Sequence, residues 1–156
     1  MVRGLFVSPY DAARGPMAEA FALAYADDSM DFFSAGLVPA GFVRPQATAV
    51  LEEVGLQVDW EHPRYLLAEH MIDVDFLVTI DAEIDDDRRK HFRGTHCKWE
   101  VENVLNKGLE VAHYRTIRDE IDALARDLVF GLRSGDLEAR LKASGGKAEI
   151  VQPPAE

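Results

Sequence analysis

Two residues near the start of the chain, Ser8 and Arg14, have types and a spacing that suit chemistry on an oxyanion. The apolar residues before Ser8 predict a buried strand, and Pro16 predicts the first turn of a helix, where its missing N–H costs nothing. The five residues between Ser8 and Arg14 would bring backbone N–H groups to a helix N-terminus, where peptide dipoles favour negative charge. The segment therefore predicts an anion-binding loop that begins with a hydroxyl and ends with a guanidinium group.

The loop is followed by Pro-Met-Ala-Glu at residues 16–19. The whole segment resembles the low molecular weight protein tyrosine phosphatase and thioredoxin-coupled arsenate reductase family, whose opening runs from a hydrophobic strand into Cys-x5-Arg-Ser/Thr and Pro-Met-Ala-Glu. The resemblance implies that Ser8 takes the place of the nucleophilic cysteine, and Gly15 that of the hydroxyl residue that holds its thiolate. It also implies an anion-binding loop made of Ser8, Pro9, Tyr10, Asp11, Ala12, Ala13, Arg14 and Gly15.

The replacement at Ser8 changes the expected chemistry most. A thiol with a reference pKa of about 8.5 is readily ionised in a positive pocket, whereas an alcohol needs a general base within hydrogen-bond distance. No histidine lies near the loop in sequence, although one could reach it through the fold. Pro9 removes an amide donor and Tyr10 adds bulk. Asp11 adds a carboxylate, which would repel phosphate or take its place beside Arg14.

The resemblance also covers a second site, after the predicted strand that ends near Trp99. Aligning on Trp99 puts Asn103 at the family position of the aspartate that acts as general acid. An amide cannot give up a proton to a leaving group, and a positioned general acid contributes about 10²- to 10⁴-fold. An alignment offset by one or two residues would instead leave Glu102 as the acid.

Further matches extend the resemblance over residues 4–132. They include the apolar run that ends in Ser-Ala-Gly at residues 34–36, a helix that starts at Pro45, and an apolar run over residues 76–80 that suits a strand buried on both faces. The resemblance implies an α/β protein of three layers with a central four-stranded parallel sheet, flavodoxin-like and phosphotyrosine phosphatase I-like. Residues 1–132 would form this domain, and residues 133–156 a C-terminal extension made of a short helix and a tail.

The remaining patterns concern one long helix, a charged segment and the histidines. Apolar residues at helical spacing predict a closing helix over residues 109–132, and the acidic-then-basic run of residues 85–90 predicts a solvated loop or short helix. Three histidines, His62, His70 and His113, are interpreted as surface or core-edge residues. The residues His91, His96 and Cys97 match no closed four-ligand pattern, so we predict no metal and no other cofactor.

Cys97 is the single cysteine of the chain. Arsenate reduction in the family passes a disulfide along several cysteines, and one thiol cannot form an internal disulfide. We therefore predict that the chain is not an arsenate reductase and that Cys97 is a small buried apolar residue.

The composition limits the class of partner. The chain has 156 residues, and 17 Lys and Arg against 28 Asp and Glu give a formal net charge of −11. This charge disfavours nucleic acid and anionic membranes and favours a neutral, basic or apolar partner. In the C-terminal extension, Leu137 and Leu141 could pack back on the domain or dock on another subunit of a homo-oligomer. The sequence contains no membrane-spanning apolar run and no secretory signal pattern, and with its single cysteine it predicts a cytoplasmic protein of one domain.

Two functional hypotheses follow. In the first, the chain is a catalytically degenerate phosphatase-like protein that binds a protein partner, or a phosphate or sulfate ion, through a face formed by residues 8–14, 37–42 and 100–106. In the second, it is an active or weakly active phosphatase in which Ser8 attacks, Arg14 stabilises charge, and Asp11 or Glu102 handles protons.

Overall fold

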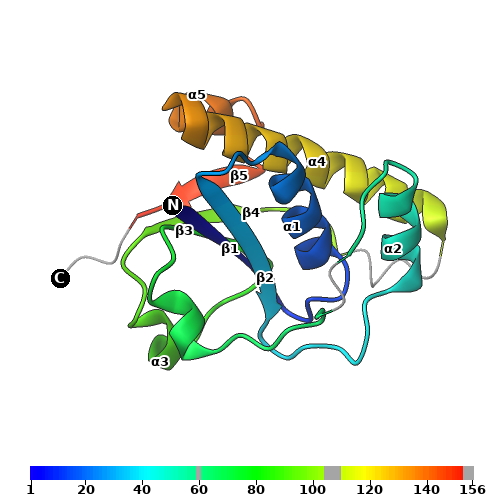
Figure 1. The fold of residues 1–156 in the computed structure, drawn as a ribbon, viewed down its shortest axis with the longest axis horizontal. Helices are drawn as coiled ribbons and strands as arrows, with labels where there is room; N and C mark the ends of the chain where they lie inside the picture. Colours follow the sequence, from blue (N-terminus) through cyan, green and yellow to red (C-terminus); the bar gives the residue numbers. More distant parts are fainter. Residues whose placement is uncertain (59–60, 104–109, 153–156) are drawn as a thin grey trace.

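A five-stranded sheet forms the centre of the computed structural model, which describes residues 1–58, 61–103 and 110–152. The strands are β1 (Val2–Ser8), β2 (Met30–Gly36), β3 (Phe76–Ile80), β4 (Thr95–Trp99) and β5 (Ala148–Val151). Their order across the sheet is β2-β1-β3-β4-β5, and only β5 runs antiparallel to its neighbour (Figure 1).

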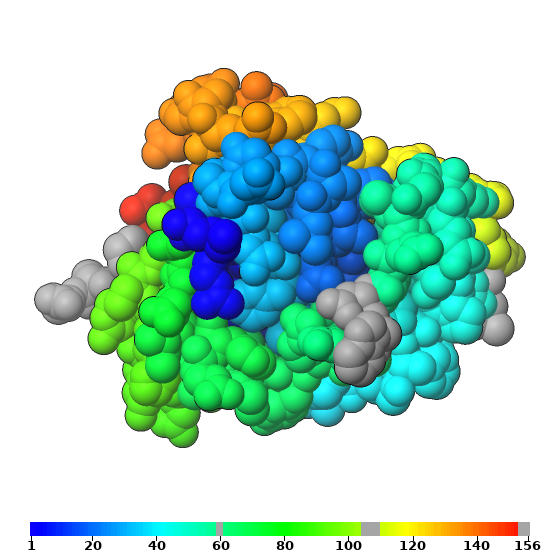
Figure 2. All heavy atoms as spheres, in the orientation of Figure 1, coloured from blue at the N-terminus to red at the C-terminus, as the bar shows by residue number. Residues whose placement is uncertain are grey.

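Helices cover both faces of this sheet. The helices are α1 (Arg14–Tyr25), α2 (Pro45–Glu52), the 3-10 helix η1 (Ala68–Met71), α3 (Asp86–Arg89), α4 (Val111–Ser134) and α5 (Leu137–Lys142). In Figure 1, α1, α2, α4 and α5 lie on one side of the sheet and α3 lies on the other. In Figure 2 the green atoms around η1 and α3 form the lower part of the molecule, below the blue atoms of β1 and α1. The predicted three-layer α/β fold is confirmed.

Two apolar cores hold the layers together. One lies between the sheet and the long helices and contains Phe6, Val78 and Trp99. The other lies on the opposite face and contains Leu5 and Leu77. Because neighbouring residues of a strand point to opposite faces, the continuous apolar runs of β1 and β3 supply both cores at once.

The strand order places the loop after β1 at the point where ligands usually bind. β1 pairs with β2 on one side and with β3 on the other. The connection from β1 to β2 therefore runs in one direction across the sheet, and the connection from β3 to β4 runs in the other. In flavodoxin-like sheets this switch point opens a crevice outside the carboxyl ends of the strands. Ser8 is the last residue of β1 and Arg14 the first of α1, so the predicted loop lies there.

Helix α4 confirms the predicted closing helix. Its buried residues recur at helical spacing, and it ends where Gly135 adopts a left-handed conformation (φ 79°). The helix begins at Val111, and the residues that precede Glu110 in the predicted range lie outside the described part of the chain. Among the helices that the structure describes, none is long and apolar enough to span a membrane.

The C-terminal extension corrects the predicted four-stranded sheet. The short helix predicted there is α5, but residues 148–151, predicted as part of a tail, form β5 and pair with β4 in a fifth, antiparallel position. These residues form a strand because their side chains alternate between the core and solvent. Ala148 is buried in the core between the sheet and the long helices and Ile150 packs against that core, whereas Glu149 is exposed. The division of the chain at residue 132 stays a prediction.

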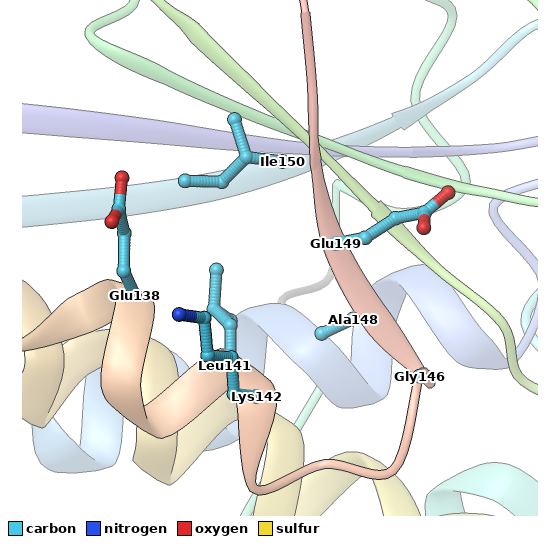
Figure 3. A pocket seen from close by; sticks show the side chains of 7 residues that line it. All are labelled: Glu138, Leu141, Lys142, Gly146, Ala148, Glu149 and Ile150. Atoms are coloured by element: carbon cyan, nitrogen blue, oxygen red, sulfur yellow. The ribbon is translucent and has the colours of Figure 1, made fainter.

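A hollow separates α5 from β5. Its volume is about 310 Å³, and Leu141, Ala148 and Ile150 give it an apolar lining, with Glu138 and Lys142 also at its wall (Figure 3). No residue of the loop after β1 lines it. The hollow therefore belongs to the extension and not to the site at the carboxyl ends of the strands.

Gly131 of α4 offers a test of how the extension packs. A Cβ at this position would lie 2.8 Å from Leu137 Cα and 2.9 Å from Leu137 Cδ1, at the start of α5. We expect Gly131→Ala to lower the free energy of unfolding by about 1–3 kcal/mol through overpacking, measured by urea denaturation. Gly41→Ala, where a Cβ meets open space, is the control. A gain of about 1 kcal/mol from helix propensity in Gly131→Ala would contradict this packing.

Candidate functional site

The loop of residues 8–14 encloses a small hollow at the N-terminus of α1. All seven residues line the hollow, whose volume of about 10 Å³ is close to the least that holds a water molecule. Ser8 and Arg14 are buried, whereas Tyr10 is 44% exposed. Among the described residues, the backbone N–H groups of the buried Ala12 and Ala13 have no acceptor. Buried N–H groups usually have partners, so these two are the donors that an anion in the predicted loop would use.

Asp11 turns its side chain to the back of this loop. Its backbone is left-handed, with φ of 49°, and its side chain is fully buried. Asp11 Oδ1 accepts a hydrogen bond from Ser34 Oγ (2.8 Å), and Asp11 Oδ2 accepts one from Arg64 N (2.8 Å). The carboxylate thus joins the loop to the end of β2 and to the segment that precedes η1.

His62 lies between two carboxylates behind the loop. Its Nδ1 is 2.7 Å from Asp11 Oδ2, its Nε2 is 2.8 Å from Glu19 Oε2, and its side chain is fully buried. Each ring nitrogen faces an acceptor, so both carry protons and the ring is an imidazolium. Burial alone would lower the pKa of His62, but the hydrogen bonds and charges of Asp11 and Glu19 raise it to about 9.

The interpretation of His62 as a surface or core-edge residue is therefore wrong, whereas His70 is half-buried and His113 exposed, as expected. His62 is separated from Asp11 by 51 positions and carries no local motif. The sequence does not predict that Asp11 and Glu19 are buried, and without that burial the need of their carboxylates for a cation or several donors gives no signal.

The position of His62 decides whether Ser8 has a general base. Both ring nitrogens bind carboxylates, so neither is available to take a proton from the Ser8 hydroxyl. Ser8 Oγ instead accepts a hydrogen bond from Asp11 N at 3.2 Å. A histidine does reach the loop through the fold, but its two ring nitrogens hold the carboxylates behind the loop and do not contact Ser8.

Arg14 is held by groups other than Asp11, which corrects the expectation that the Asp11 carboxylate would take the place of phosphate beside it. Its Nη1 donates to Val101 O at 2.9 Å, and its Nη2 lies 3.6 Å from Asp81 Oδ2. Burial lowers the pKa of Arg14, and the charge of Asp81 opposes that effect. Asp11 cannot take this place because its left-handed backbone turns the carboxylate towards Ser34.

Gly15 gives the Asp11 carboxylate its room. A Cβ at Gly15 would lie 2.7 Å from Asp11 Oδ1 and 3.0 Å from Ser8 Oγ. A serine or threonine here, as in the resembled family, would require the carboxylate to move. The residues at 11 and 15 therefore depend on one another.

The segment after β4 reaches the loop through Arg14. Val101, which accepts the hydrogen bond from Arg14, is buried, Glu102 is exposed and Asn103 is half-buried. Residues 104–109, which include the rest of the predicted 100–106 loop, lie outside the described residues. The role of Asn103 at the family position of the acid stays a prediction.

The predicted 37–42 loop lies directly beside the anion loop. Val38 N donates to Pro9 O, and Ala40 N donates to Tyr10 O, both at 2.9 Å. Exposed apolar side chains gather on these segments and on the bridged residue 65, where they form a rim around the hollow: Tyr10, Val38, Phe42 and Tyr65. Two of the three segments of the predicted binding face are thus assembled.

Cys97 is fully buried on the face of β4 opposite to His96. Burial raises the pKa of its thiol to about 12, so it stays protonated at neutral pH. The prediction of a small buried apolar residue is confirmed.

The charge of His62 predicts how stability depends on pH. The folded pKa of about 9 exceeds the ordinary value of 6.5, so the imidazolium contributes fully below pH 6.5, and this contribution is lost as pH rises through 9. We expect the free energy of unfolding to fall by on the order of 3 kcal/mol over that range. Urea denaturation between pH 6 and 10 measures it, with His113→Gln as control. An NMR titration that puts the pKa of His62 near 6.5 would contradict the geometry.

The dependence between Gly15 and Asp11 is also testable. We expect Gly15→Ala to lower the free energy of unfolding by about 1–3 kcal/mol, because the methyl group displaces the buried carboxylate. The pKa of His62 should fall in the same variant, since one of its two acceptors moves. Gly41→Ala should change neither quantity. An unchanged His62 titration in Gly15→Ala would show that the carboxylate does not occupy this space.

Comparison with known proteins agrees with the fold. A family model described as low molecular weight phosphotyrosine protein phosphatase matches residues 3–143. An arsenate reductase from Archaeoglobus fulgidus DSM 4304 is 29% identical, with 81% of this chain and 98% of that chain covered and a TM-score of 0.66. The YwlE arginine phosphatase from Geobacillus stearothermophilus is 22% identical, with 88% and 97% covered and a TM-score of 0.71.

A third similar structure is a cysteine-to-serine mutant of the YwlE arginine phosphatase with a phosphorylated active-site serine. It is 23% identical, with 85% of this chain and 97% of that chain covered and a TM-score of 0.70. The two YwlE structures support the fold alone, and the family model covers most of the sequence. The chain belongs to the low molecular weight phosphotyrosine protein phosphatase family.

Proposed function

We propose that this chain is a catalytically degenerate member of its family that binds an oxyanion, or a partner carrying one, through the face around residues 8–14. The observation that carries the proposal is the engagement of His62 by Asp11 and Glu19, which leaves the Ser8 hydroxyl without a general base. An unactivated alcohol is a weak nucleophile, and a positive pocket does not ionise it as it would a thiol.

Asp11 offers no substitute for that base. Its two carboxylate oxygens already accept hydrogen bonds from Ser34, Arg64 and His62, and these bonds hold the loop in shape. Taking the Ser8 proton would remove the negative charge that the imidazolium needs in the interior. The step that would use Asp11 as a base therefore works against the scaffold of the loop.

The leaving group lacks a clear proton donor as well. The amide of Asn103 cannot supply a proton, and Glu102 is exposed, so it remains the alternative acid only if it turns towards the loop. Loss of both the thiolate and the acid supports the absence of turnover more strongly than either loss alone.

Binding is supported by what the loop retains. The N–H groups of Ala12 and Ala13 and the guanidinium of Arg14 can all face an oxyanion at the N-terminus of α1. The rim formed by Tyr10, Val38, Phe42 and Tyr65 adds exposed apolar surface around the hollow. A partner that combines an oxyanion with apolar groups suits both features.

A second candidate function is phosphoryl transfer to Ser8. In the YwlE mutant a serine in the active site is phosphorylated, which supports the idea that a serine in such a loop can accept the group. The oxygen–phosphorus bond of the donor ester would break, a bond from Ser8 Oγ to phosphorus would form, and the hydroxyl proton would pass to the departing alcohol. Arg14 would stabilise the charge on the phosphoryl oxygens.

Assays with an aryl phosphate and with inorganic phosphate separate the two functions. We expect no turnover by the native protein above that of Ser8→Ala, and phosphate binding, followed by NMR shifts of the loop amides, that is at least tenfold weaker in Arg14→Gln. Arg133→Gln, on the surface of α4, is the matched control. Ser8→Cys should remain far below family rates, because the thiolate returns without an acid.

Mass spectrometry after incubation with the aryl phosphate gives the deciding result. Turnover that Ser8→Ala abolishes, or a stable phosphoryl group on Ser8, would replace the binding proposal with the second function. If phosphate causes no shift of the loop amides, the proposal that the loop binds an oxyanion is wrong.

A further inference from the structure

The segment of residues 88–99 has a charge opposite to that of the rest of the chain. It contains five Lys and Arg, two His and no Asp or Glu, which leaves twelve basic residues against 28 acidic ones elsewhere. The function proposed above makes no use of this segment. Four of its cations together form a basic strip: Arg89, Lys90, Arg93 and Lys98.

The basic strip lies beside α3, at the edge of the sheet face that η1 and α3 cover. Arg89 is the last residue of α3, Lys90 and Arg93 lie in the turn that follows, and Lys98 belongs to β4. The core on this face of the sheet contains residues of β1, β2 and β3 but none of β4. Lys98 is exposed on that uncovered face, and α3 lies at the lower left of the molecule in Figure 1.

No carboxylate within the described residues forms an ion pair with the strip. Each of its four cations lacks an ion pair there, although Arg88, one residue earlier, pairs with Asp85. The acidic residues closest by element and register, Asp86, Asp87 and Glu149, form no ion pair with any of the four. Several arginines elsewhere do form ion pairs, as Arg115 and Arg118 do with Glu53.

A partly buried contact holds one of these cations in place. Arg89 Nη1 donates to His96 Nδ1 at 3.3 Å, so the proton of the neutral ring sits on Nε2, which donates to Thr79 Oγ1 at 2.8 Å. Burial, together with the charges of Arg89 and Lys98, lowers the pKa of His96 to about 4. The ring between these two cations therefore stays neutral at neutral pH and adds no charge of its own.

We propose that the basic strip is a docking site for a short acidic segment of a partner protein. The four cations are spread over a helix end, a turn and a strand, an arrangement that suits several separate carboxylates better than one small anion. The net charge of −11 repels long polyanions at a distance, which disfavours nucleic acid. The strip adjoins the binding face, because Arg88 donates to Leu66 O and lies 5.6 Å from the Tyr65 ring centroid.

Fluorescence anisotropy with a labelled hexaglutamate peptide tests the proposal on the full chain. We expect binding that weakens as salt is raised, and at least tenfold lower affinity in Arg89→Gln/Lys98→Gln. The control Arg126→Gln/Lys142→Gln removes the same charge from exposed positions on α4 and α5 and should change affinity less than twofold. If the double variant fails to fold, Lys98→Glu at an exposed position replaces it and should also weaken binding of the peptide.

A second readout uses the native protein. Bound carboxylates should screen Arg89 and Lys98 from His96, so the His96 pKa should rise above about 4 when the peptide is saturating, as followed by NMR. Absence of salt-dependent binding, equal loss in the control, or tighter binding of a single-stranded twelve-nucleotide RNA through the same residues would each overturn the proposal. None of these outcomes depends on whether Ser8 reacts.

Discussion

The shape of the anion loop depends on one buried cation, the imidazolium of His62 between Asp11 and Glu19. This contact ties the loop after β1 and the first helix to the segment that precedes η1. Buried charges are costly to desolvate, and the cost is offset here because each ring N–H faces its own carboxylate. Glu19 is held further by Ser34 N at 2.9 Å, so the same network reaches the end of β2. A neutral ring would place one unprotonated ring nitrogen directly against a buried carboxylate oxygen.

Small residues around this network allow the loop and its neighbours to pack closely. Gly15 leaves room for the Asp11 carboxylate, and a Cβ at Gly36 would lie 2.9 Å from the backbone carbon of Tyr10. The loop therefore packs directly on the end of β2, and hydrogen bonds from residues 38 and 40 fasten it from the other side. These constraints act on the backbone and are indifferent to whether position 8 carries sulfur or oxygen. The shape of the loop therefore does not depend on a sulfur atom at this position.

Sequence reasoning succeeded where the physical signal is local or periodic. The apolar run of β3 and the helical spacing on α4 each predicted an element, and the spacing of Ser8 and Arg14 predicted the loop. It failed for β5, because four residues with one exposed charge carry too little pattern to distinguish a strand from a tail. It failed for His62 because that residue acts through partners distant in sequence. The rule that buried carboxylates need compensation gives no help there, because the sequence does not predict that Asp11 and Glu19 are buried.

The two carboxylates around the loop differ in their freedom to respond to a ligand. Asp11 is fully buried and accepts hydrogen bonds on both oxygens, whereas the side chain of Asp81 is 64% exposed and touches Arg14 at a loose 3.6 Å. In the function proposed above, an oxyanion would therefore displace the exposed Asp81 carboxylate from Arg14 and leave the buried Asp11 in place. The buried part of the site sets the shape of the loop, and Asp81 is the carboxylate that this binding would exchange.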